Sequence, residues 1–349
     1  MGSRGSFGSR FGVIAAVSGS VIGLGNIWRF PYVAGENGGA AFILIYIACS
    51  FLISIPLMLS EFSLGRSSKR NTKRAFQKLA PGTRWNYVGY MGIFCAFILL
   101  SFYCVIAGWA LEFIKESVLN EFAGKSAAQI SENFNGFIAS GWRPVVWMGV
   151  FMLSTAFIVW SGIEKGIERY TKIFMPVFIV LLAALAINSL TLPNIFAQMP
   201  GGYWIAIVFF VLLFLAAITS SISMFEVIAA YLTEELRMSR PKAVVGVLVT
   251  ILVTGSLCAL SQRPGSSLHI GSMNLFDLCD YLSSNVLMPL GGLLIVIFTG
   301  WVFSPEKLRN ELTNNLTVNL WCYPAIRLLI RFVVPVVITL LFLTQIGIL

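Results

Sequence analysis

Nine apolar segments, each long enough to cross a lipid bilayer, follow one another along this chain. They lie at 11–33, 40–64, 87–114, 144–163, 174–190, 204–232, 243–260, 278–303 and 325–349. A helix needs roughly 20 residues to span the hydrocarbon layer, and a lipid-exposed segment must satisfy its backbone hydrogen bonds internally. We therefore expect an all-α polytopic membrane protein with about nine transmembrane helices, forming a single transmembrane domain over residues 1–349.

The composition agrees with a membrane location. Of the 349 residues, 57% are hydrophobic and only 11% are charged, which leaves too little polar surface for a soluble domain of this size. The six cysteines are scattered without a C-x-x-C pair, so we expect mostly inert core thiols. Because His269 is the sole histidine, a histidine-based metal site or a hydrolase triad lacks its parts. We expect no enzyme.

The lysines and arginines are divided unequally between the two sides of the predicted membrane. One side receives only Arg29, Lys115, Lys125, Arg143 and Arg263. All the others fall in the N-terminal segment, in the connections on the opposite side or, for Arg327 and Arg331, at the inner end of the last span, and such basic segments stay cytoplasmic. We therefore expect a cytoplasmic N-terminus and, after an odd number of spans, a C-terminus outside. The formal net charge of +9 then belongs to cytoplasmic loops next to the lipid bilayer, and we expect no nucleic-acid partner.

The first apolar segment is interrupted between Gly19 and Pro31 by glycines, an amide, an arginine and a proline. Irregular backbone at membrane depth persists only where it is buried in protein or lines a cavity. Broken membrane helices of this kind typically form binding sites for ions or polar ligands. The interruption therefore predicts a binding site.

The motifs around this break carry a family resemblance. They are RFGVIAAVSGSVIGLGNIWRFPY at 10–32, ENGGAAF at 36–42 and PLMLSEFSLGR at 56–66, followed by SGIEKGIER at 161–169, FLAAITSS at 214–221 and YLTEEL at 231–236. The chain resembles the bacterial neurotransmitter:sodium symporters over nearly its whole length. The resemblance implies two inverted repeats of five helices, each starting with a broken helix, and a location in the bacterial cytoplasmic (inner) membrane.

The chain departs from the family pattern between 190 and 202. The segment that resembles the end of the family's fifth helix runs directly into the approach to its eighth, so we expect the sixth and seventh helices to be missing. Removing two spans leaves the orientation of every later segment unchanged. A natural variant, a recombination at the junction and a mis-assembled sequence all remain open as origins.

The resemblance maps one sodium site onto five residues of two helices. Carbonyl oxygens would come from Gly19, Ile22 and Ala216, and hydroxyl oxygens from Thr219 and Ser220. Backbone carbonyls and hydroxyls suit a sodium ion because they bring oxygen ligands without adding a full charge to the membrane. The alternative is that the two hydroxyls only bond to the preceding helical turn.

The same resemblance assigns some of the ligands of a second sodium ion and some of the residues that would bind the substrate. Val21 and Asn26 would supply the first-helix part of an incomplete second sodium site. The substrate residues would be Val21, Gly23, Gly25, Leu99 and Tyr103, with the Tyr103 hydroxyl on the substrate carboxylate. The alternative for Tyr103 is an ordinary buried tyrosine with a local hydrogen bond.

Charged residues near the spans match the gates of the family. Arg29 and Asp280 would form the outer gate, and Arg4 and Glu234 an inner latch. The alternative for the second pair is two solvated charges, whose interaction contributes well under about 1 kcal/mol.

Two functions remain open at this stage. The resemblance implies sodium-coupled symport of an amino acid or related small amine by alternating access. The missing helices leave room for a transport-incompetent remnant that keeps the scaffold and one sodium site. In either case the expected ion is Na⁺.

Overall fold

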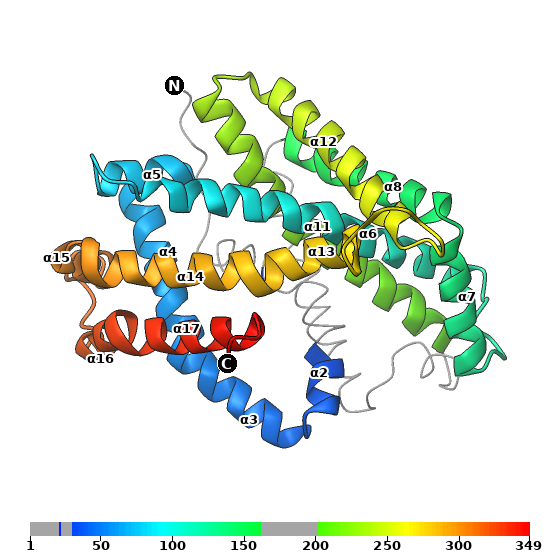
Figure 1. Ribbon diagram of the computed structural model, residues 1–349, viewed down its shortest axis with the longest axis horizontal. Coiled ribbons are helices and arrows are strands. Elements are labelled where there is room, and N and C mark those ends of the chain that lie inside the picture. Colours follow the sequence, from blue (N-terminus) through cyan, green and yellow to red (C-terminus); the bar gives the residue numbers. More distant parts are fainter. Residues whose placement is uncertain (1–20, 22–29, 162–201) are drawn as a thin grey trace. The chain divides into compact units, whose positions relative to one another are not determined.

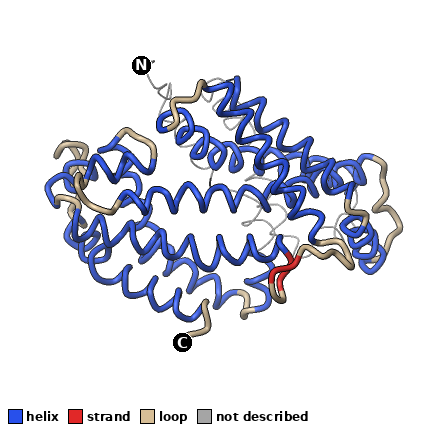
Figure 2. Tube along the Cα trace, turned by 45° about the horizontal axis from the view of Figure 1, so that its top comes forward, coloured by secondary structure: helices blue, strands red, loops and turns tan. Residues whose placement is uncertain are grey.

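The computed structural model describes residue 21 and residues 30–161 and 202–349, and this part of the chain is almost entirely helical (Figures 1 and 2). Its first half contains α2 (Phe30–Glu36), α3 (Ala40–Cys49), η2 (Ser50–Ser54), α4 (Ile55–Ser68), α5 (Thr72–Leu79), α6 (Asn86–Val118), α7 (Ala127–Ala139) and α8 (Trp142–Ser161). Its second half contains α11 (Gly202–Glu235), α12 (Arg240–Ser261), β1 (His269–Ile270), β2 (Met273–Asn274), α13 (Leu275–Tyr281), η3 (Leu282–Leu287), α14 (Met288–Ile297), η4 (Phe298–Val302), α15 (Pro305–Leu312), α16 (Tyr323–Leu328), η5 (Leu329–Val333) and α17 (Val334–Gln345). The elements labelled η are π-helical turns.

Seven continuous helices among the described residues are long and apolar enough to cross a membrane. They cover Ala40–Ser68, Asn86–Val118, Trp142–Ser161, Gly202–Glu235, Arg240–Ser261, Leu275–Val302 and Tyr323–Gln345. Each coincides with one of the segments expected from the sequence. The expected span at 174–190 lies outside the described residues, and the span at 11–33 is described only at Val21 and from Phe30 onward. The expectation of an all-α membrane fold is confirmed.

The described helices divide between two compact units. The first contains residues 1–36, 99–229 and 238–279, and the second contains residues 37–98, 230–237 and 280–349. The boundary falls inside α6, α11 and α13, so each of these helices contributes to both units.

The first unit is built on a close approach of α6, α8 and α12. A Cβ atom at Gly108 of α6 would lie 2.7 Å from the Met148 nitrogen of α8, so only glycine allows this contact. A Cβ atom at Gly255 of α12 would lie 2.9 Å from the Cys104 sulfur of α6. Small residues at such crossings let helix backbones approach closely, which is how membrane helices gain packing energy.

Aromatic side chains attach α11 to the other helices of the first unit. Phe210 stacks on Phe113 of α6 with ring centroids 5.1 Å apart, and Phe214 meets Phe151 of α8 edge-on at 5.8 Å. The Tyr203 hydroxyl also donates to the Val118 carbonyl at 3.2 Å. From the Tyr203–Val118 contact to the Phe210–Phe113 contact, residue numbers rise along α11 and fall along α6, so the two helices run antiparallel.

A buried glutamate connects the ends of α6 and α8. The Glu112 side chain is 4% exposed and accepts hydrogen bonds from Lys115, Arg143 and the Trp147 indole. A charge removed from water needs such partners. Two cations and an indole therefore supply the partners of the buried Glu112 side chain.

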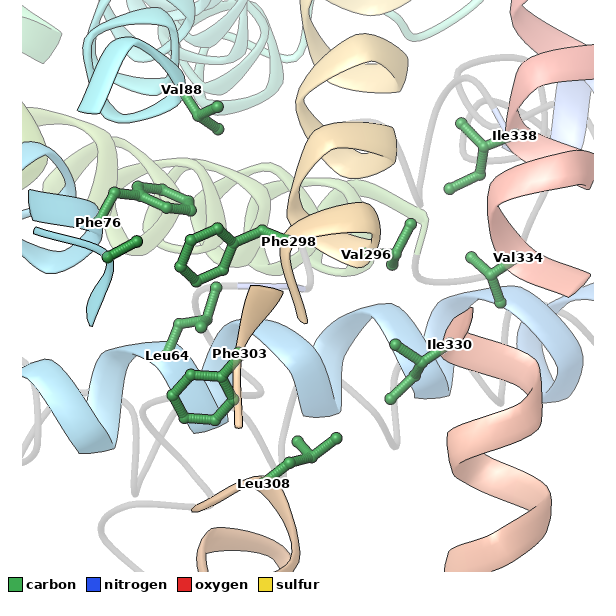
Figure 3. Close-up of a cluster of buried hydrophobic side chains, with 11 residues drawn as sticks. Leu64, Phe76, Val88, Val296, Phe298, Phe303, Leu308, Ile330, Val334 and Ile338 are labelled. Atoms are coloured by element: carbon green, nitrogen blue, oxygen red, sulfur yellow. The ribbon is translucent and has the colours of Figure 1, made fainter. Parts of the chain in front are cut away.

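The second unit has an apolar core between α4, α5, α6, α14, α15 and the C-terminal helix (Figure 3). Phe298 lies at its centre, where Phe76 and Trp85 meet it edge-on at 4.9 and 5.2 Å. The Gly292 position is also tight, because a Cβ atom there would lie 3.3 Å from the Leu57 side chain. Figures 1 and 2 show α14 and α17 side by side in this unit.

Prolines explain three of the four described π-helical turns. The turns η2, η3 and η5 each end immediately before an α-helix whose second residue is proline, namely Pro56, Pro289 and Pro335. A proline lacks the N–H and its ring crowds the carbonyl of the preceding turn. A wider turn before the proline relieves this conflict and keeps each span continuous.

A polar network joins α5 to the last turn of α11 in the second unit. Asn71 caps α5 by accepting from the Arg74 nitrogen at 2.9 Å, and its amide nitrogen donates to Glu234 at 2.9 Å. Glu235 pairs with both Lys73 and Arg74. The hydrogen bond to Glu235 raises the pKa of Lys73 above its ordinary value, which favours the charged ammonium form.

We predict that Gly108→Ala destabilises the protein by about 1–3 kcal/mol, because the new methyl group must separate α6 from α8. The matched control is Gly149→Ala on α8, where no atom lies within 4 Å of the added Cβ and helix propensity improves. The unfolding temperature in detergent is the readout. Equal unfolding temperatures for the two variants would contradict the close contact.

We predict that Asn71→Ala lowers the free energy of unfolding by about 1–2 kcal/mol, because the cap of α5 and the side-chain bond to Glu234 are both lost. Asn71→Ser keeps a capping oxygen and should lose less. Thermal unfolding of both variants measures the difference. A serine variant no more stable than the alanine variant would argue against the cap.

Candidate functional site

One turn of α11 gathers three oxygen atoms that were expected to act together. The Thr219 hydroxyl lies 2.8 Å from the Ala216 carbonyl oxygen and the Ser220 hydroxyl lies 3.4 Å from the same atom. Ala216 is 1% exposed and Thr219 is 9% exposed. The turn is therefore a compact group of neutral oxygens, buried at Ala216 and Thr219 and half-buried at Ser220.

The two contacts are hydrogen bonds of the kind expected if Thr219 and Ser220 bond only to their own helix. Both hydroxyls donate to the preceding turn of their own helix, as membrane serines and threonines often do. A hydroxyl oxygen that donates in this way keeps its lone pairs, so the bonds do not prevent it from coordinating a cation. Ligation of an ion by this turn stays a prediction.

Ser221 was not singled out from the sequence, although it follows the two expected ligands directly. Its side chain is fully buried, and its hydroxyl has no hydrogen-bond partner within the described ranges. A buried hydroxyl without a partner costs free energy. The third consecutive hydroxyl residue of the motif is the signal that could have drawn attention to it.

The expected first-helix residues lie largely outside the described part of the chain. Gly19, Ile22, Gly23, Gly25, Asn26, Arg29 and Arg4 all belong to the ranges that are not described. Val21 is described as helical, with a side chain that is 65% exposed.

Leu99 and Tyr103 lie one turn apart on α6, and both are half-buried. Tyr103 is ten residues from Phe113, and Ser220 is ten residues from Phe210, the ring that Phe113 stacks on. With a rise of about 1.5 Å per residue, straight antiparallel helices would place Tyr103 and Ser220 at the same level.

Each of the two expected acidic gate residues accepts a hydrogen bond in the described part of the chain. The Asp280 carboxylate accepts from the Ser284 hydroxyl at 2.9 Å, at the point where α13 passes into η3. One oxygen of Glu234 accepts from the backbone nitrogen and the side-chain amide of Asn71 at 3.2 and 2.9 Å. The described residues thus show Glu234 within the network that fixes α5, a role the sequence did not suggest.

Comparison with known proteins matches most of the chain to the family that its sequence motifs resemble. The sodium:neurotransmitter symporter family matches residues 4–136 and 187–348. A sodium-dependent transporter of Bacillus subtilis (strain 168), YhdH, is 30% identical, and the alignment covers 98% of this chain and 97% of that protein. A sodium-dependent transporter of Haemophilus influenzae is 26% identical, with 98% of each chain covered.

A solved structure is also similar to the fold described above. The crystal structure of MhsT in complex with L-phenylalanine matches with a TM-score of 0.90 and 32% identity, covering 98% of this chain and 100% of that chain. The fold and these relatives are those of multi-pass membrane transporters rather than enzymes. Both the residues matched and the extent of the similarity lead to one conclusion: the chain belongs to the sodium:neurotransmitter symporter family.

Proposed function

We propose that this protein moves an amino acid or a related small amine across the bacterial cytoplasmic membrane together with Na⁺, by alternating access. The observation that carries the proposal is the buried turn at Ala216, Thr219 and Ser220, which offers three oxygens within a few ångströms of one another. Family membership supports the use of sodium. The amino-acid class is supported by MhsT, whose structure contains L-phenylalanine.

The proposed sodium site joins this turn to the broken first segment. Carbonyl oxygens of Gly19 and Ile22 would complete the set, so that five neutral oxygens surround the ion. Hard cations bind oxygen ligands, and unwound backbone supplies them at membrane depth. Val21 and Asn26 would belong to a second sodium site, which we propose is incomplete in this chain.

The proposed substrate site also uses the broken first segment. Backbone groups of Val21, Gly23 and Gly25 would hold the ends of an amino acid, and the Tyr103 hydroxyl would bind its carboxylate. Leu99, one turn before Tyr103 on α6, would contact the substrate. A sodium ion at the α11 turn and a substrate carboxylate at Tyr103 would attract each other.

Charged pairs would open and close the two sides of this site. Arg29 with Asp280 is the proposed outer gate, and Arg4 with Glu234 the proposed inner latch. In the same proposal the chain forms one transporter domain, its N-terminus is cytoplasmic and its C-terminus lies outside.

A specific observation favours a second candidate, a remnant that binds one sodium ion but transports nothing. The alignment with YhdH runs over 439 positions, whereas this chain has 349 residues. YhdH therefore contains residues in this alignment that have no counterpart in this chain. Loss of the sixth and seventh helices near 190–202 would remove one wall of the substrate site and leave the α11 turn in place.

We predict that sodium stabilises the parent protein against heat and that Thr219→Ala and Ser220→Ala each weaken this effect. A ligand present at about 100-fold above its Kd adds about 2.7 kcal/mol of stability. Ser223→Ala is the matched control, because its hydroxyl lies one turn further along α11 and donates to the Thr219 carbonyl. Unfolding temperatures are compared in sodium and in an impermeant organic cation. Identical sodium responses in all four proteins would rule out the α11 site.

We predict sodium-driven uptake of a labelled amino acid into proteoliposomes that contain the purified chain. An inward sodium gradient should raise uptake above that of empty liposomes, and its collapse should abolish the difference. A sodium response in thermal unfolding without any uptake, tested across a panel of amino acids, would favour the remnant over the symporter.

A further inference from the structure

Two buried cysteines lie in contact between α12 and α13 in the first unit. The sulfur atoms of Cys258 and Cys279 are 3.8 Å apart, and the residues are 1% and 8% exposed. Cys258 lies three residues before the end of α12, and Cys279 lies in the middle of α13. Neither cysteine forms a disulfide in the structure.

The ends of these two helices are held in a fixed register by a second contact. The Ser261 hydroxyl donates to the Cys258 carbonyl at 2.8 Å and accepts from the Phe276 nitrogen at 3.1 Å. Ser261 is 2% exposed, so water does not compete for these bonds. The two sulfurs therefore meet because the helices are docked, and not through the chance rotation of an exposed side chain.

A third cysteine lies nearby but has a different partner. The Cys104 thiol of α6 donates to the Ser101 carbonyl at 3.3 Å and lies against Gly255 of α12. Among the cysteines within the described ranges, a sulfur-to-sulfur contact is recorded for Cys258 and Cys279. These two thiols are therefore the pair suited to join.

We propose that Cys258 and Cys279 form a reversible disulfide that fastens α13 to α12. Sulfurs in van der Waals contact need only a short approach to reach the bond length of about 2 Å. The connection between the two helices is expected on the outer, non-cytoplasmic side of the membrane, and disulfides persist in oxidising compartments. The bond would thus form on the side of the membrane where it is stable.

The oxidation requires an external oxidant, a disulfide of the glutathione or thiol-oxidoreductase class. The thiolate of Cys279, the more exposed residue, attacks one sulfur of that disulfide, and one thiol of the oxidant leaves. The Cys258 sulfur then attacks the Cys279 sulfur and expels the second thiol. Two protein thiols become one disulfide, and the two electrons and two protons they lose reduce the oxidant to two thiols.

The bond would act on transport through the residue that follows Cys279 in the chain. This part of the inference rests on the proposed function, in which Asp280 belongs to the outer gate. Fastening α13 to α12 would restrict movement of the backbone that carries the Asp280 carboxylate. Oxidation should then slow transport, and reduction should restore it.

The test treats the purified full-length protein with oxidised glutathione, blocks the remaining thiols with N-ethylmaleimide after denaturation and measures the intact mass. The reduced protein should bind a label at each of its six cysteines, and the oxidised protein should bind two fewer. Peptide mapping should recover the peptides of Cys258 and Cys279 as one species. Labelling of every cysteine after oxidation, or a bond between a different pair, would overturn the proposal.

Cys258→Ser and Cys279→Ser separate the pair, while Cys49→Ser, an exposed cysteine of the second unit, is the matched control. Oxidation should reduce sodium-driven uptake by the parent and by Cys49→Ser, and neither pair variant should respond. Equal uptake by oxidised and reduced parent protein would refute the effect on the gate. A mapped disulfide in a protein that shows no uptake even when reduced would support the bond and count against the proposed function alone.

Discussion

The close approach of α6 and α8 at Gly108 is the contact on which the first unit depends. Lipid is as apolar as a leucine side chain, so membrane helices gain little from burial and must gain from packing. With no side chain at Gly108, the α8 backbone at Met148 lies directly against α6, and Gly255 lets α12 approach the same region. The stacked rings of Phe113 and Phe210 then place α11. The buried turn at Ala216 owes its surroundings to this arrangement.

The sequence was sufficient for the fold class because membrane helices are specified locally. A segment such as 87–114 is recognisable from its length and apolar content alone, and its helix extends only a few residues further, to Asn86–Val118. The π-helical turns were not anticipated, although Pro56, Pro289 and Pro335 carry their signal. A proline in an apolar run predicts a local disturbance, but the form of that disturbance depends on how neighbouring helices satisfy the freed backbone groups.

The residues of the candidate site likewise divide into those whose neighbours follow from the local sequence and those whose neighbours depend on helix packing. Ala216, Thr219 and Ser220 lie within one helical turn, so their proximity follows from sequence spacing once the helix is recognised. The partner of Glu234, in contrast, is Asn71, 163 positions away, and the partners of Glu112 include Trp147 on another helix. Such pairs depend on the rotation and register of two helices, which no local pattern encodes. The contact between Cys258 and Cys279 also depends on helix rotation, because rotating α13 about its axis would separate the two sulfurs.

In the proposed mechanism the α11 turn completes one sodium site, and the second sodium site is proposed to be incomplete. The most direct measurement is equilibrium binding of radioactive sodium to the purified protein, taken to saturation and expressed per chain. We predict one sodium ion per chain, because the five oxygens proposed for the first site belong to residues of this chain, whereas the second site is proposed to lack part of its ligands. Saturation at two ions per chain, or no bound sodium in a folded sample, would contradict it.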